Sequence, residues 1–182
     1  MEILSAQKSS QVLYCETPDD FFKRRPSRNV HAKCSVVVDE LHDANGITLT
    51  VDHQRLFVVE GKHLRGFNVD LDDDRRVTDY ASIDMSFPCD NVNPSPDKPN
   101  ELLVACFPKP LQLITAPYPF AGHAAMIRKV DVGKKTQQPF KIDVNGSVVS
   151  GITGAFQRGP FTVAVSVYDG LRYMVCSDYT KI

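Results

Sequence analysis

Three side chains, Asn45, Asp90 and Asn91, carry oxygen donors of the type that holds a hard cation. Asn45 precedes Gly46 just before a β-prone apolar run, and Asp90 and Asn91 are adjacent at the start of another expected strand. Calcium takes six to eight oxygen ligands, which carboxylates and carboxamides supply. Taken alone, Asn-Gly and Asp-Asn pairs mark turns and caps more often than metal sites. On residue type alone, turn-forming residues are therefore the favoured interpretation, and ligands of a hard cation are the alternative.

Two charged segments are better explained without a ligand. Residues 70–74 read Asp-Leu-Asp-Asp-Asp but lack the Gly and the terminal Glu of a helix-loop-helix calcium site, so we expect a solvated turn. Residues 17–33 contain a short basic run at 23–26 that ends in proline. We expect these residues to form a mobile loop rather than a nucleic-acid or targeting patch.

The composition predicts a soluble chain without a strongly charged partner. The 182 residues suit one domain, and 21 Lys and Arg against 22 Asp and Glu give a formal charge of -1. Neither sign forms a long block, so nothing favours nucleic acid or an anionic membrane. Residues 1–10 lack the apolar core of a signal peptide, and no stretch approaches the ~20 apolar residues of a membrane span. We expect a small-molecule or protein partner, and the compartment stays open.

Short apolar runs separated by turn residues must position the candidate ligands. Residues 47–60 form two such runs around a polar turn, which is typical of a hairpin. No segment sustains a helical period. About a dozen short strands indicate an all-β sandwich, barrel or propeller, and three four-stranded propeller blades fit the length. Beside the hairpin, strands are expected at 11–15, 34–38, 63–69, 76–85, 101–107, 111–116, 125–130, 140–144, 148–154, 161–168 and 171–176.

The five cysteines give no metal-binding pattern. Their number is odd, and no two are spaced as CxxC or CxxxC, which argues against a zinc knuckle and against a dense disulfide framework. The spacing is compatible with one disulfide or with none.

Several ordered motifs resemble the calcium-dependent paraoxonase/arylesterase family, whose fold is a six-bladed β-propeller related to gluconolactonase-like and strictosidine-synthase-like proteins. The resemblance covers residue 34 to the C-terminus. It implies an all-β partial β-propeller of about three four-stranded antiparallel blades at 34–182, the second half of a family member. Before it, the residue pattern at 1–33 predicts one strand and the mobile basic loop. The motifs are Ala-Asn-Gly-Ile at 44–47, Leu-Phe-Val-Val-Glu at 56–60, Asp-Asn-Val at 90–92, Leu-Val-Ala-Cys-Phe-Pro at 103–108, Asn-Gly-Ser-Val at 145–148 with Gly151, and Tyr-Met-Val-Cys at 173–176.

The resemblance also implies a calcium ion at the bottom of a central tunnel, held in this chain by Asn45, Asp90 and Asn91. In the family the ion polarises an ester, lactone or phosphotriester oxygen and stabilises the oxyanion that forms when water attacks. The family's other calcium ligands are a Glu and a second Asn. These two ligands and the family's paired histidines belong to its N-terminal half, which the motifs of this chain do not match. We therefore expect the five histidines to be surface or turn residues: His31, His42, His53, His63 and His123.

Four positions match the family's tunnel wall: Phe107, Thr153, Val167 and Tyr168. Phe107 replaces a common His and Asp43 replaces an aromatic residue, so no substrate preference carries over; ordinary strand packing is the alternative role. Cys106 matches a buried unpaired cysteine. Cys176 matches one that closes the propeller in secreted members, and its partner lies in the missing half, so we expect a free thiol.

The sequence thus predicts a truncated calcium-dependent hydrolase of small-molecule esters or lactones, with weak or no activity alone. A half-ring leaves open blade edges, which favour self-association. Two alternatives remain open. One is a non-catalytic β-propeller or β-sandwich interaction module in which the three candidate ligands are turn residues, and the other is a gluconolactonase-type sugar-lactone hydrolase.

Overall fold

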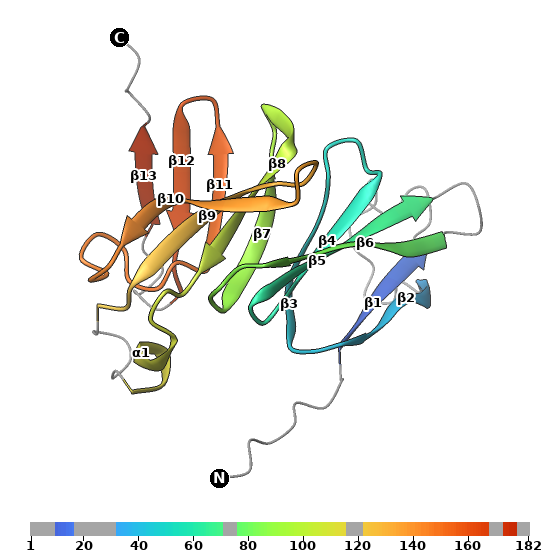
Figure 1. The fold of residues 1–182 in the computed structure, drawn as a ribbon, viewed down its shortest axis with the longest axis horizontal. Helices are drawn as coiled ribbons and strands as arrows, with labels where there is room; N and C mark the ends of the chain where they lie inside the picture. Colours follow the sequence, from blue (N-terminus) through green and yellow to red (C-terminus); the bar gives the residue numbers. More distant parts are fainter. Residues whose placement is uncertain (1–9, 17–31, 71–75, 116–121, 168–172, 178–182) are drawn as a thin grey trace.

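A computed structural model describes residues 10–16, 32–70, 76–115, 122–167 and 173–177. Figure 1 shows three antiparallel sheets side by side, with a hairpin at the N-terminal side. The hairpin is β1 (Ser10–Glu16) and β2 (Lys33–Leu41), and the first sheet is β3 (Ala44–Leu49), β4 (Arg55–Glu60), β5 (His63–Asp70) and β6 (Arg76–Asp84). The second sheet is β7 (Cys89–Ser95), β8 (Lys98–Cys106), β9 (Ala125–Asp131) and β10 (Thr136–Asp143), and the third is β11 (Gly154–Arg158), β12 (Phe161–Val165) and β13 (Tyr173–Ser177).

The strands follow one another in sequence order within each sheet, and the strands β3, β7 and β11 begin the three sheets. β7 contacts β3 on one side and β11 on the other, so the first strands of the sheets lie next to each other. Two four-stranded meanders and a three-stranded one, with adjoining first strands, are the arrangement expected of successive propeller blades. The set of sheets is not closed into a ring, and the predicted partial β-propeller is therefore confirmed.

Apolar side chains fill each gap between neighbouring sheets. Phe57 and Met85 contribute to the core between the first and second sheets, and Leu103 and Ile152 to the core between the second and third. A third core lies between the hairpin and the first sheet. Since the second sheet is packed on both faces, its strand β7 is held firmly between its neighbours.

One face of the third sheet is apolar and exposed. Its side chains come from all three strands, and the register places Phe156 beside Val163 and Val163 beside Val175. The opposite face, with Ala155 and Ala164, packs on the second sheet. The exposed members are Phe156, Phe161, Val165, Tyr173 and Val175.

Several predicted elements were wrong. Residues 111–116 were expected as a strand, but α1 (Pro110–Thr115) is a helix. Residues 148–153 form bends and irregular chain, not the predicted strand, because the backbone N–H groups of Val148 and Val149 bond to the carboxylate of Asp143. Of the two charged segments, residues 17–31 and 71–75 lie outside the described residues. No helix in the described ranges is long and apolar enough to cross a membrane.

The cysteine predictions were also partly wrong. Two disulfides form, Cys15–Cys34 within the hairpin and Cys89–Cys106 between β7 and β8, where one at most was expected. Cys106 is buried as predicted but is not unpaired, because Cys89 stands opposite it in the strand register. Cys176 is a free thiol, as expected.

Candidate functional site

Asn45 lies in a bulge at the start of β3. Ala44 pairs with Glu60 and Ile47 pairs with Val58, so β3 carries one more residue between these pairs than β4 does. The turn into the strand is made by Asp43, whose φ of 47° lies in the left-handed region. The bulge interrupts the regular alternation of side chains and turns the Asn45 carboxamide toward the neighbouring sheet.

Asp90 and Asn91 form a second bulge at the start of β7. Cys89 pairs with Cys106 and Val92 with Val104, which leaves two residues of β7 opposite one residue of β8. Like Asn45, they begin the first strand of a sheet. Such bulges re-aim side chains and are frequent beside functional sites.

The two bulges meet because Gly46 has no side chain. A Cβ atom built on Gly46 would lie 2.5 Å from the Cα of Asn91, 2.6 Å from the carbonyl oxygen of Asp90 and 2.8 Å from the nitrogen of Val92. Real Cβ atoms do not approach backbone this closely. Gly46 is therefore required for the contact between two backbones, whereas the sequence suggested that it serves a sharp turn.

The three predicted ligands are brought together. Hydrogen bonding from the side chain of Asn45 lowers the pKa of the Asp90 carboxyl, so these two side chains are neighbours. The Nδ2 atom of Asn91 donates to Asp90 Oδ1 at 3.1 Å and to the carbonyl oxygen of Thr153 at 2.7 Å. The backbone nitrogen of Asn91 bonds to the same carbonyl at 3.2 Å. Thr153 directly precedes β11, so residues at the starts of the first strands of all three sheets meet here.

The site is electrostatically suited to a cation. Burial raises the pKa of the Asp90 carboxyl, and the hydrogen bond from Asn45 only partly offsets that rise. A neighbouring positive charge stabilises such a partly desolvated carboxylate more than it stabilises a fully solvated one. Within the described ranges, no group of three or more His, Cys, Asp or Glu residues could hold a metal. An ion here would rely on one carboxylate together with carboxamide and carbonyl oxygens, and this hard oxygen set fits calcium better than zinc.

Of the four predicted wall residues, the structure describes three. Phe107 is buried, and its backbone nitrogen bonds to the carbonyl of Pro88 at 2.9 Å. Thr153 is buried too, and its nitrogen bonds to Val165. Val167 is exposed, and Tyr168 lies outside the described residues. Thr153 belongs with the ligand cluster through its carbonyl oxygen, a contribution that sequence reasoning missed because any residue type supplies it.

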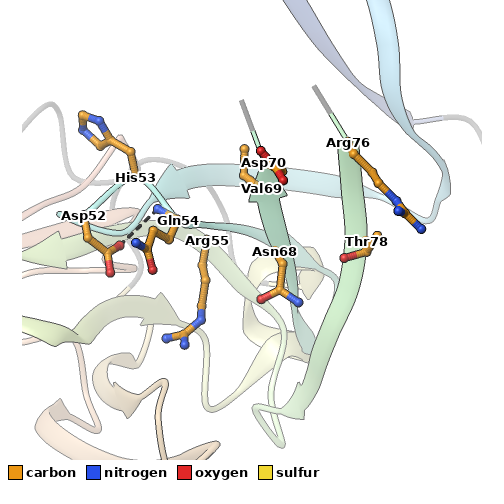
Figure 2. Close-up of a pocket in the computed structure, with 9 residues that line it drawn as sticks. All are labelled: Asp52, His53, Gln54, Arg55, Asn68, Val69, Asp70, Arg76 and Thr78. Carbon is orange, nitrogen blue, oxygen red and sulfur yellow. Dashed lines mark hydrogen bonds between the residues drawn. The ribbon is translucent and has the colours of Figure 1, made fainter. Parts of the chain in front are cut away.

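A cavity of about 770 Å³ lies at the other end of the first sheet, in the turn after β3 and at the adjoining ends of β5 and β6. Figure 2 shows that Arg55 and Arg76 point away from each other there, while Asp52 bonds to the backbone of Gln54. Four residue steps separate Asn45 from Leu49 at the end of β3, so the strand places this cavity roughly 13 Å or more from Asn45. Charges of both signs line it without converging, so it is not the predicted site.

One histidine prediction was wrong. His123 is 2% exposed, and its Nδ1 atom lies 3.1 Å from the hydroxyl oxygen of Ser150, which also accepts a bond from the His123 backbone nitrogen at 2.8 Å. It is buried because the chain before β9 packs under residues 146–151. His53 is exposed, His42 and His63 are half-buried, and His31 lies outside the described residues.

Comparisons with known proteins support the fold and leave the function open. No protein-family model matches the chain, and no curated protein matches it. Among solved structures, the chain is similar to a luciferin-regenerating enzyme, with a TM-score of 0.52 and 12% sequence identity. The similarity covers 82% of this chain and 44% of that one, so the chain spans less than half the length of the neighbour. At this identity the likeness concerns the fold alone.

Proposed function

We propose that the chain is the calcium-binding part of a paraoxonase/arylesterase-type hydrolase of esters or lactones. The observation that carries this proposal is the convergence of Asn45, Asp90 and Asn91 from two neighbouring sheets. Residues that serve only as turns have no reason to meet across sheets, with a half-buried carboxylate between two carboxamides. Thr153 adds a carbonyl oxygen from the residue that precedes the third sheet.

Each residue has a defined role in this proposal. Asp90 supplies the charge, Asn45 and Asn91 supply neutral oxygens, and Gly46 lets the two strands approach. A bound calcium ion would polarise the ester or lactone oxygen and stabilise the oxyanion. The carboxamides now bonded to Asp90 would turn their oxygens toward the ion, since an amide presents nitrogen and oxygen at nearly the same position.

Efficient hydrolysis also needs a group that deprotonates water. Among the described histidines, His123 is buried against Ser150. The other three do not belong to a motif that matches the family's base: His42, His53 and His63. Three predicted protein side chains also provide fewer than the six to eight oxygens that calcium prefers. We therefore propose that this chain alone binds a cation weakly and has weak or no hydrolase activity. The same expectation holds if the parent activity is that of a gluconolactonase-type lactone hydrolase.

A non-catalytic interaction module is the second candidate, and the exposed apolar face of the third sheet favours it. The first and second sheets are covered on both faces by other parts of the chain, whereas this face is not covered by any described residue. In a longer propeller another blade would pack there. We propose that a second copy of the chain covers it when no such blade is present.

Calcium titration by isothermal calorimetry tests the main proposal. We expect a dissociation constant of roughly 10⁻⁴ to 10⁻³ M, as in weak extracellular calcium modules. Asp90→Ala should abolish the binding heat. Asp79→Ala is the matched control, because Asp79 is an exposed carboxylate on β6 that pairs with Arg65. Equal losses in both variants, or no heat in the unmodified chain, would contradict a specific site.

A further inference from the structure

The disulfide Cys89–Cys106 lies directly beside the proposed ligands. It joins β7 to β8 at positions that are opposite in register, and both residues are buried. Cys89 is the residue before Asp90. The crosslink therefore ends where the bulge begins.

The bulge depends on both of its boundaries. In a regular strand, residues three apart face opposite sides of the sheet. Cys89 and Val92 nevertheless pack in the same core, between the first and second sheets. The extra residue between them allows both side chains to face the same core, and it leaves Asp90 and Asn91 outside the regular pairing of β7 with β8. If the pairing at Cys89 shifted by one residue, Asp90 would move to the other face and leave Asn45.

Without the disulfide, only hydrogen bonds would hold the end of the bulge at Cys89. The nitrogen of Cys89 bonds to the carbonyl of Gly61 at 2.9 Å, and that of Phe107 bonds to the carbonyl of Pro88 at 2.9 Å. Beyond these bonds, the chain enters β7 through Ser86, whose φ is 64°. A covalent bond between Cys89 and Cys106 excludes a change of register that hydrogen bonds permit.

We propose that the Cys89–Cys106 disulfide is a positioning crosslink, which fixes the register at the start of β7 and thereby holds Asp90 and Asn91 in place for a cation. The calcium-binding test of this proposal rests on the proposed function, but the structural test by hydrogen exchange does not. The other disulfide, Cys15–Cys34, is a matched control. It also links two antiparallel neighbours, with a sequence separation of 19 against 17. Loop-closure entropy therefore predicts nearly equal effects of the two bonds on global stability.

The structural test is hydrogen exchange at the backbone amide of Asn91, which bonds to Thr153. We compare Cys89→Ala/Cys106→Ala with Cys15→Ala/Cys34→Ala, both without calcium and well below their unfolding temperatures. Exchange at Asn91 should accelerate at least tenfold in the first variant and stay unchanged in the second. The amide of Val58, in the centre of the first sheet, reports any general loosening and should not change in either variant. Unchanged exchange at Asn91 in a folded first variant would overturn the proposal.

The functional test is calcium titration of the same two variants. Groups that orient metal ligands typically change affinity by 10–100-fold when they are removed, so we expect at least a tenfold loss in Cys89→Ala/Cys106→Ala and none in the control. Equal affinities in both variants would overturn the positioning role. No binding by the unmodified chain would instead contradict the proposed function, while the exchange result still decides the role of the disulfide.

A chemical variant covers the case in which Cys89→Ala/Cys106→Ala does not fold. Cys15→Ala/Cys34→Ala retains a single disulfide and can be treated with dithiothreitol. Each reaction transfers two electrons and two protons to the disulfide, giving two thiols and the cyclic disulfide of the reagent. Alkylation and mass spectrometry measure the opened fraction. The loss of calcium affinity should follow that fraction, and affinity that is independent of it would contradict the proposal.

Discussion

Gly46 and Asn91 lie in backbone contact across two sheets, so closely that a Cβ atom on Gly46 would be 2.5 Å from the Cα of Asn91. The contact joins the bulge of β3 to the bulge of β7 and sets the distance between Asn45 and Asp90. The geometry of the candidate site therefore depends on a residue that contributes no ligand atom.

Gly46→Ala should separate the two bulges. The methyl group meets backbone atoms, which cannot rotate away, so the strands must move apart at a cost of about 1–3 kcal/mol of unfolding free energy. Calcium binding should be lost in the calorimeter, and urea unfolding should show the destabilisation. Gly61→Ala is the control for calcium binding, since a Cβ atom on Gly61 would meet no atom within 4 Å. Its φ of 58° still makes that substitution mildly destabilising. Normal calcium binding by Gly46→Ala would show that the site does not need the close approach.

Asp90→Asn should stabilise the calcium-free chain while it removes calcium binding. Burial raises the pKa of Asp90, so the ionised carboxylate is unfavourable in the folded state at neutral pH. Asn retains an acceptor oxygen for Asn45 and removes the charge. We expect the melting temperature in a chelator to rise by a few degrees at pH 7. Since a raised pKa lowers stability only above the unfolded value, the gain should vanish below pH ~3.9. A lower melting temperature at pH 7 would contradict this account.

Asp143 should have the opposite pH dependence. Burial alone would raise the pKa of its carboxyl, but backbone hydrogen bonds, the foremost from Val148 at 2.7 Å, outweigh it and lower the pKa. A lowered pKa stabilises the fold above the unfolded value of ~3.9, and this stability is lost as the pH falls through the folded value. Asp143→Ala should cost about 1–2 kcal/mol in urea unfolding at pH 7. A cost that persists undiminished under acidic conditions would show that packing, not charge, is responsible.

The sequence predicted the sheets better than it predicted their connections. Alternating apolar runs identified most strands, because one face of each strand is buried between sheets. The run at 111–116 became a helix, since a short apolar run does not distinguish helix from strand. The strand β11 was missed because Gly154–Arg158 contains no apolar run long enough to be recognised.

The candidate site was predictable only where side chains carry it. The resemblance identified Asn45, Asp90 and Asn91 as a group, and the structure places them together. The carbonyl oxygen of Thr153 was not predictable, because the backbone is the same in every residue. Likewise, the pairing of Cys89 with Cys106 depends on which strands are neighbours, and cysteine spacing alone does not give that information.

The apolar face of the third sheet should mediate self-association. Phe156→Ser/Val175→Thr removes two exposed apolar side chains that lie on this face, on strands β11 and β13. Analytical ultracentrifugation should show concentration-dependent association of the unmodified chain, and at least a tenfold weaker dimer in this variant, as expected when ~1.4 kcal/mol is lost. Leu111→Ser is the control, since Leu111 is exposed even more, at 72% against 47% for Phe156 and 54% for Val175, but lies on α1. Weakening by the control to the same extent would show that association is unspecific.

The last prediction concerns catalysis, and it follows from which groups are present. Metal-assisted ester cleavage needs an ion with an open coordination position, a base for water and a pocket for the acyl group. The described residues supply three candidate ligand side chains, but none of the described histidines belongs to a motif that matches the family's base. Hydrolysis of phenyl acetate or a γ-lactone by this chain should therefore remain near background, with or without calcium.

Activity should appear when the N-terminal blades of a related full-length protein are added, because these would complete the ligand set and supply a base. That activity should be lost on chelation and in Asp90→Ala, and retained in Asp79→Ala. Robust turnover by the 182 residues alone, lost on chelation and in Asp90→Ala, would contradict the view that the site is incomplete. The base would then be sought first at His42, whose backbone nitrogen bonds to Glu60 at 2.6 Å beside the start of β3, and next at His123.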